Sequence, residues 1–170
     1  MSRTIFITIL QFILISLAQI LLLNNVQLFG YVQPILYIWF LILLPNNTPK
    51  WLLMILGFTL GLTMDLFSSQ LGFHTATATL TATLKPLVLS WFTNHFDNNT
   101  FRPSVAEMGL ASFLGFISVI TFLHTAIYIC IETFTFSELG LLLIEILLST
   151  IVSIILILIC DTIFIRTKRD

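Results

Sequence analysis

Residues 139–165 read LGLLLIEILLSTIVSIILILICDTIFI, an apolar run interrupted by only two carboxyl groups, Glu145 and Asp161. A membrane-spanning helix needs about 20 apolar residues, so this run can cross a bilayer with some tilt. In the whole chain 58 % of residues are hydrophobic and 9 % are charged, against about 25 % charged in a soluble domain. A domain of this size leaves roughly a third of its unfolded surface exposed. The excess apolar surface therefore requires lipid as its solvent.

Five further apolar stretches precede this run, and loop-like breaks rich in Asn, Pro and Ser separate them. They are residues 5–23, 28–44, 51–67, 71–92 and 105–131. The second and third stand at the short limit of the range for a membrane helix, and the fifth, like 139–165, exceeds its usual length. No break is long enough for a second domain. The sequence predicts one all-α transmembrane domain over residues 1–170, a polytopic integral membrane protein of about six helices.

Two of these stretches allow another interpretation. Residues 5–23 follow Arg3 and resemble a secretory signal peptide, but no small-residue cleavage site follows them, so an uncleaved first helix is favoured. Residues 75–83 read TATATLTAT, an alternation typical of a strand. An open strand edge in lipid leaves backbone groups unpaired at several kcal/mol each, so a helix is favoured. Thr75 and Thr79 then share a face suited to close helix packing.

The positive charges are distributed unevenly if successive loops alternate between the two sides. One side then carries six of the seven Lys and Arg residues: Arg3, Lys50, Arg102, Arg166, Lys168 and Arg169. The loops 24–27, 68–70 and 132–138 on the other side carry none, and Lys85 lies within the fourth span, from which it can extend toward the basic side. Cytoplasmic loops are enriched in Lys and Arg. The pattern predicts that both termini are cytoplasmic.

Glycines and one carboxyl group share a face of the third span. Gly57, Gly61 and Asp65 repeat at a spacing of four, so another backbone can approach them closely and meet Asp65. The face fits either an internal contact with the next helix or a contact with a partner or ligand. Gly72 and His74 follow a short polar turn, which makes a close Asp65–His74 pair plausible. A metal site requires three or four ligands, so we expect neither a metal nor a cofactor.

Other polar residues lie on faces predicted to point into the bundle. His124 is expected to be hydrogen-bonded inside it, and Asp161 to pair with the basic tail. The remaining members of this group are Thr4, Thr8, Gln11 and Gln19 on the first span, and Glu145, Ser149 and Ser153 on the last. Cys130 and Cys160 have no metal or redox spacing and are expected to be free thiols. No catalytic motif and no basic patch for nucleic acid is present, so we expect no enzyme.

Residues 57–74 read GFTLGLTMDLFSSQLGFH, and this segment resembles the signature of MreD, the rod shape-determining membrane protein family of bacteria. Gly61, Asp65, Gly72 and His74 occupy the places of the glycine, aspartate, glycine and histidine of that signature. The segment covers about a tenth of the chain. Chain length, hydropathy and a short basic tail extend the likeness over the whole sequence.

The resemblance implies a non-enzymatic component of the cell-elongation machinery (the elongasome) in the bacterial inner membrane. Its partner would be an MreC-like single-span protein. The MreB filament, a transglycosylase and a penicillin-binding protein of peptidoglycan synthesis would be indirect partners. On this basis Gly57, Gly61, Asp65, Gly72, His74, Thr75 and Thr79 are the candidate partner or helix-packing residues.

The MreD family is also similar in fold to the substrate-binding subunits of energy-coupling-factor transporters, so the alternative function is binding of a small, vitamin-type solute. Such a subunit needs an outward cavity with convergent polar groups, for which Asp65, His74, His124 and Glu145 are candidates. A scaffold needs instead a lipid-exposed groove or a small-residue face that a partner helix fills.

The predicted topology places the two cysteines at opposite sides of the membrane. Cys130 falls near the outer end of the fifth span and Cys160 near the inner end of the sixth, too far apart for a disulfide, whose Cα atoms lie within about 7 Å. An impermeant thiol reagent added to cells should label Cys130 and spare Cys160. Labelling of Cys160 alone would contradict this topology.

Overall fold

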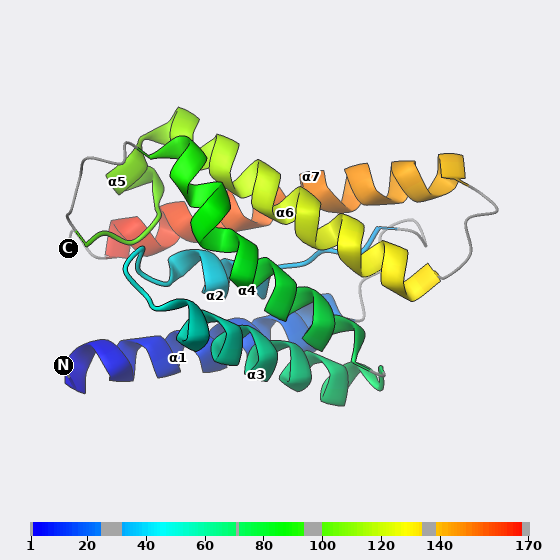
Figure 1. Ribbon diagram of the computed structural model, residues 1–170, viewed down its shortest axis with the longest axis horizontal. Helices are drawn as coiled ribbons and strands as arrows, with labels where there is room; N and C mark the ends of the chain where they lie inside the picture. The colour runs from blue at the N-terminus through cyan, green and yellow to red at the C-terminus, as the bar shows by residue number, and fades with distance from the viewer. Residues whose placement is uncertain (1, 25–31, 71, 94–99, 134–138, 168–170) are drawn as a thin grey trace.

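The computed structural model describes residues 2–24, 32–70, 72–93, 100–133 and 139–167, and every regular element in these ranges is a helix (Figure 1). The long helices are α1 (Ser2–Ala18), extended by the π-helical turn η1 (Gln19–Leu23), α3 (Lys50–Ser68), α4 (Phe73–Phe92), α6 (Leu110–Thr133) and α7 (Leu139–Thr167). Two short helices, α2 (Ile38–Leu43) and α5 (Val105–Met108), complete the fold. The predicted all-α class is confirmed.

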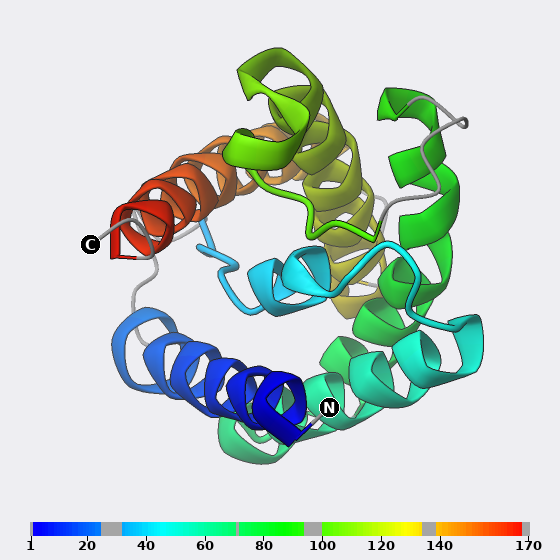
Figure 2. The same cartoon turned by 90° about the vertical axis from the view of Figure 1, so that its left-hand side faces the viewer.

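The long helices form a ring around a central segment that contains α2 (Figure 2). Successive parts of the chain run alternately between the two ends of this ring, and both termini lie at the same end (Figure 1). We call this end the terminal end and the other the distal end. Four stretches are long and apolar enough to cross a membrane: Ile5–Leu23, Lys50–Ser68, Leu110–Thr133 and Gly140–Ile163. Helix α4 has a comparable length, but its threonines and Lys85 make it less apolar.

The central segment is where the fold departs most from the predicted helix over residues 28–44. Its described part, residues 32–44, begins without helix, and only the six residues of α2 are helical. Pro34 has no N–H to donate, and a residue before proline favours extended backbone. Every residue from Val32 to Leu44 except Gln33 is buried. The high hydropathy of this stretch therefore reflects burial inside protein instead of contact with lipid.

Side chains from the surrounding helices bind the non-helical backbone of this segment. Gln19 Oε1 accepts hydrogen bonds from the N–H groups of Leu36 at 2.6 Å and Tyr37 at 3.2 Å. Two serines of α7 accept hydrogen bonds from N–H groups of the same segment: Ser149 from Gln33 at 3.1 Å and Ser153 from Ile35 at 2.9 Å. Irregular backbone is tolerated at membrane depth only where protein or enclosed water satisfies it. Gln19, Ser149 and Ser153, which belong to the polar groups of the first and last spans, thus have a structural role.

The glycine face of α3 packs against α4. A Cβ atom added to Gly57 would lie 2.8 Å from both the Ala78 carbonyl oxygen and the Ala82 Cβ, and one added to Gly61 would meet the backbone of His74 and Thr75. Residues 75–83 are helical, as predicted. Thr79 donates its hydroxyl to the carbonyl four residues earlier, at 2.7 Å, which satisfies the side chain within its own helix.

The contacts near the terminal end concern three further expectations, of which the pairing of Asp161 with the basic tail stays a prediction. Lys85 does not extend out of the bundle: it is buried and donates to the Leu44 carbonyl oxygen, at the end of the central segment. Asp161 Oδ2 accepts from the Val105 N–H at 3.1 Å at the start of α5, while Lys168 and Arg169 of the basic tail lie outside the described residues. The predicted span 105–131 is divided at Gly109, whose φ of 75° ends α5 before α6 begins.

Filling the glycine face should separate α3 from α4. Gly61→Leu should destabilise the protein by about 1–3 kcal/mol or more, because the new side chain overlaps backbone that cannot rotate away, and Gly57→Leu should act in the same direction. Thermal unfolding in a mild detergent measures both. Phe58→Leu is the matched control, since Phe58 is exposed on the same helix; equal stability of all three variants would contradict the close contact.

Candidate functional site

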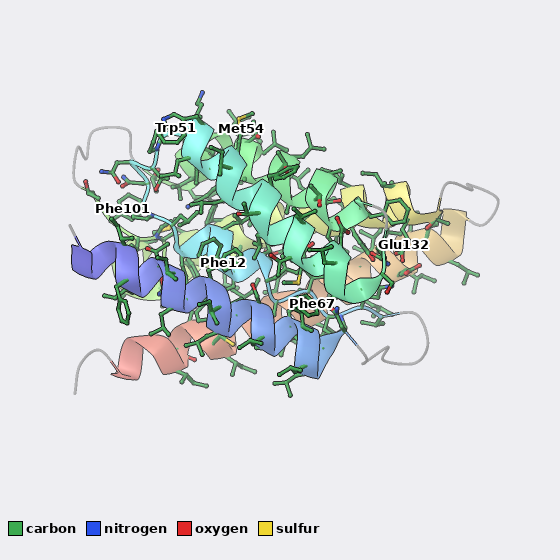
Figure 3. All side chains as sticks on the ribbon, turned by 90° about the horizontal axis from the view of Figure 1, so that it is seen from below. Phe12, Trp51, Met54, Phe67, Phe101 and Glu132 are labelled. Atoms are coloured by element: carbon green, nitrogen blue, oxygen red, sulfur yellow. The ribbon has the colours of Figure 1, made fainter. Side chains whose placement is uncertain are left out.

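A polar cavity of about 310 Å³ lies at the distal end of the bundle. Figure 3 labels two of its lining residues, Phe67 and Glu132, at the end opposite to Trp51 and Phe101. The described residues that line it are Gln19, Leu23, Asn24, Gln33, Pro34, Ile35, Phe67, Ser68, Ser69, Gln70, His74, Tyr128 and Glu132. The gathering of polar side chains from several helices at one place is the strongest indication of a site.

The α3–α4 hairpin builds one wall of this cavity. Ser69 and Gly72 both have positive φ, 55° and 86°, and reverse the chain between the two helices. Asp65 then reaches from α3 to cap the start of α4: Oδ1 accepts from the His74 N–H at 3.0 Å, and Oδ2 accepts from the Thr75 N–H at 2.9 Å and from the Thr75 hydroxyl. A carboxylate is stabilised there by the unpaired N–H groups and the positive end of the helix dipole.

The predicted Asp65–His74 pair exists, but through the histidine backbone. The His74 ring takes part in a different network, in which Tyr37 Oη lies 3.0 Å from His74 Nδ1 and 2.7 Å from His124 Nε2. On its other side, His124 Nδ1 lies 2.8 Å from Thr81 Oγ1. The expected hydrogen-bonded His124 inside the bundle is confirmed. We call Tyr37, His74, Thr81 and His124 the buried relay.

The buried relay allows two directions of donation. Thr81 can give its single hydroxyl proton either to the Thr77 carbonyl oxygen at 2.8 Å or to His124 Nδ1. A neutral imidazole carries one N–H, so in the first case His124 Nε2 accepts from the Tyr37 hydroxyl and Tyr37 accepts from His74 Nδ1–H, and in the second case both bonds are reversed. His74 Nε2 is an acceptor in the first arrangement and an N–H donor in the second, and no described residue hydrogen-bonds to it.

A second set of hydrogen bonds holds the cavity rim. Tyr128, stacked on the His74 ring at 4.6 Å between centroids, donates to Gln70 Oε1 at 3.1 Å. Gln70 Nε2 in turn donates to Glu132 Oε1 at 3.2 Å. Asn24 donates to Ser68 Oγ at 2.7 Å and so joins the end of η1 to α3. These bonds fix side chains from three separate parts of the chain around one opening.

The sequence analysis proposed two sets of site residues, the partner or helix-packing candidates and the outward polar candidates. Gly57, Gly61, Asp65, Gly72, Thr75 and Thr79 form the α3–α4 hairpin and its internal packing, and only His74 also lines the cavity. Of the outward polar candidates, Asp65 caps α4, His124 lies in the buried relay and Glu145 is half-buried outside the lining set.

Several cavity residues were missed by the sequence analysis. Gln33 lies in the stretch predicted to be a membrane helix, as does Tyr37 of the buried relay, and Gln70, Tyr128 and Glu132 are isolated polar residues in the sequence. No spacing rule joins them, because they come from different helices. The concentration of Gln, Asn and Ser at predicted distal loops was the only available signal.

Within the described ranges, no three His, Cys, Asp or Glu side chains come close enough together to hold a metal ion. Both cysteines are free. Comparison with known protein families, with characterised proteins and with solved structures finds no match for this chain. The class therefore rests on the structure itself: an all-α protein whose four long apolar helices are compatible with a multi-pass membrane protein.

Replacing Asp65 should destabilise the protein more when both carboxylate oxygens are lost than when only the negative charge is lost. Asp65→Leu leaves the His74 and Thr75 N–H groups unpaired and should cost about 1–3 kcal/mol. Asp65→Asn keeps one acceptor oxygen and should cost less. Thermal unfolding of both variants in detergent tests the order, and a milder effect of Leu than of Asn would show that Asp65 is not the cap.

Removing the central hydroxyl of the buried relay should destabilise the bundle. Tyr37→Phe leaves two imidazole nitrogens without their partner, at about 1–3 kcal/mol in total. Combined with His124→Leu, the effect should be less than additive, because the two residues share one hydrogen bond. Tyr128→Phe is the control, since its hydroxyl lies at the cavity, where water can replace it. A larger loss for Tyr128→Phe would contradict the assignment.

Proposed function

We propose that this chain is an MreD-like, non-enzymatic membrane component of the bacterial cell-elongation complex, binding an MreC-like partner within the bilayer to help organise peptidoglycan synthesis. The observation that carries the proposal is the hairpin: Gly61, Asp65, Gly72 and His74, which bear the resemblance, act together in one structural unit. A signature whose members support each other structurally is less easily produced by chance than four scattered matches.

The short loops between the predicted spans support a scaffold that works inside the membrane. The longest loop of the predicted topology, residues 93–104, is too short to contact a filament or a periplasmic synthase extensively. Useful contacts would therefore be made by helix packing, which in lipid relies on close van der Waals contact and occasional hydrogen bonds. Glu132 and the rest of the cavity rim add a polar patch at the distal end.

The glycine face of α3 is not the surface we assign to the partner, because α4 already fills it. The partner helix would pack on the lipid-facing sides of the ring, where α1 and α7 expose long rows of Leu and Ile side chains. A photo-crosslinking residue at Leu14 on α1, Phe58 on α3 or Leu148 on α7, each exposed, would identify the helix that meets the partner.

The orientation we propose has both termini in the cytoplasm of an inner membrane, with six crossings of which the second is the central segment. The terminal end, near Trp51 and Phe101 in Figure 3, carries the neighbouring Lys50 and Arg102. The distal loops 24–27, 68–70 and 132–138 carry no Lys or Arg. This asymmetry supports a cytoplasmic terminal end.

A paired experiment tests this function. Depletion from a rod-shaped bacterial host should cause rounding, and the protein should co-purify in mild detergent with an MreC-like single-span protein, while uptake of labelled vitamins stays normal. Glu107→Gln, at an exposed position on α5, serves as the depletion-rescue control. Normal rods together with defective uptake would reverse the assignment.

The polar distal cavity favours a second candidate, a solute-binding subunit of a transporter. A subunit of that kind requires an outward cavity with convergent polar groups, and the lining set contains Gln, Asn, Ser, His, Tyr and Glu side chains. This function ranks second because a solute cavity does not explain why Gly61, Asp65 and Gly72 match the MreD signature. The uptake arm of the paired experiment separates the two functions.

A further inference from the structure

The distal cavity offers polar groups to a solute. His74 lines the cavity, and its Nε2 has no hydrogen-bond partner among the described residues. This nitrogen accepts or donates a hydrogen bond according to the direction of the buried relay, so it suits a hydroxyl group, which does both. Glu132, whose Oε1 accepts from Gln70 Nε2 at 3.2 Å, adds a carboxylate at the same opening.

The described residues that line the distal cavity carry negative and no positive formal charge. Among the described residues that line the cavity, Glu132 is the only carboxylate and none is Lys or Arg. Elsewhere in the chain, Lys85 bonds to Leu44 and Arg102 bonds to Gln11 at 3.3 Å, away from the cavity lining. A carboxylate without a nearby cation disfavours an anionic ligand and favours an amine, which can form a charge-assisted hydrogen bond.

We propose that the distal cavity binds a small cationic polyol: a solute with one amine for Glu132 and several hydroxyl groups for the neutral polar side chains. Asn24, Gln33, Ser69 and Gln70 supply amides and hydroxyls around the opening, which can both donate to and accept from hydroxyl groups. His74 Nε2 forms a hydrogen bond with one of the hydroxyl groups at the wall of the cavity.

The size of the cavity limits the ligand to about one ring. Ligand pockets span roughly 300–1,000 Å³, and 310 Å³ stands at the lower end of that range. A monosaccharide-sized solute fits, whereas an oligosaccharide or a nucleotide does not. The bonds from Tyr128 through Gln70 to Glu132 hold the carboxylate in place before the ligand arrives, which reduces the entropy lost on binding.

This inference does not depend on the scaffold proposal, and it specifies a ligand class for the cavity that the second candidate uses. A scaffold can carry a bound solute, so cell shape and partner recovery are separate measurements. Binding to the purified chain is measured without a partner. If the purified chain does not bind the solute, the scaffold proposal is unaffected. If the protein has no partner, the proposed binding site is unaffected.

The test compares three sugars of one size and different charge: glucosamine, glucose and glucuronate. Calorimetric titration of the full chain in detergent should give millimolar or tighter binding of glucosamine, weaker binding of glucose and none of glucuronate. Glu132→Gln keeps the shape and one hydrogen-bonding oxygen but removes the charge, and should weaken glucosamine binding about tenfold, to the level of glucose. Glucose binding itself should stay the same in this variant.

Glu107→Gln is the matched control, because Glu107 is an exposed carboxylate on α5, outside the cavity. It should bind glucosamine as the unchanged protein does. Thermal unfolding of each variant without sugar verifies that the fold is retained. Absence of glucosamine binding, equal binding of glucuronate, or equal loss in Glu107→Gln and Glu132→Gln would each overturn the proposal.

Discussion

The structure depends on satisfying the backbone of residues 32–37, which passes through the middle of the bundle without forming a helix. Unpaired backbone groups inside a membrane protein cost several kcal/mol each. Gln19, Ser149 and Ser153 supply the required acceptors from two different helices. The ring of long helices is therefore held around its centre by hydrogen bonds from α1 and α7 as well as by apolar packing.

The same constraint explains why polar residues persist in such an apolar chain. Asp65 caps the start of α4, Asp161 accepts from the start of α5, and Lys85 donates to the last carbonyl of the central segment. Each of these side chains binds a backbone group at the point where a helix begins or irregular chain ends. The intramembrane charges thus need not mark an ion pathway, because helix ends and irregular backbone already require them.

Hydropathy predicted the helical class, and spacing predicted the glycine face, since both depend on neighbours along one helix. Gly57 and Gly61 of α3 both pack against α4, because a four-residue spacing places them on one side of their helix. The central segment could not be predicted in this way, because an apolar stretch buried in protein has the same composition as one in lipid. The cavity was missed for a related reason: Gln33, His74 and Glu132 meet only through tertiary packing.

The hairpin and the cavity are mechanically one unit. His74 receives its backbone position from Asp65 and its ring position from Tyr37 and from stacking on Tyr128. Tyr37 in turn is held by Gln19 through its N–H group and by His124 through its hydroxyl. A solute that bonds to His74 would therefore act on a residue connected to α1, α3, α4 and α6 at once. These bonds form one continuous set of contacts between the wall of the cavity and the surrounding helices.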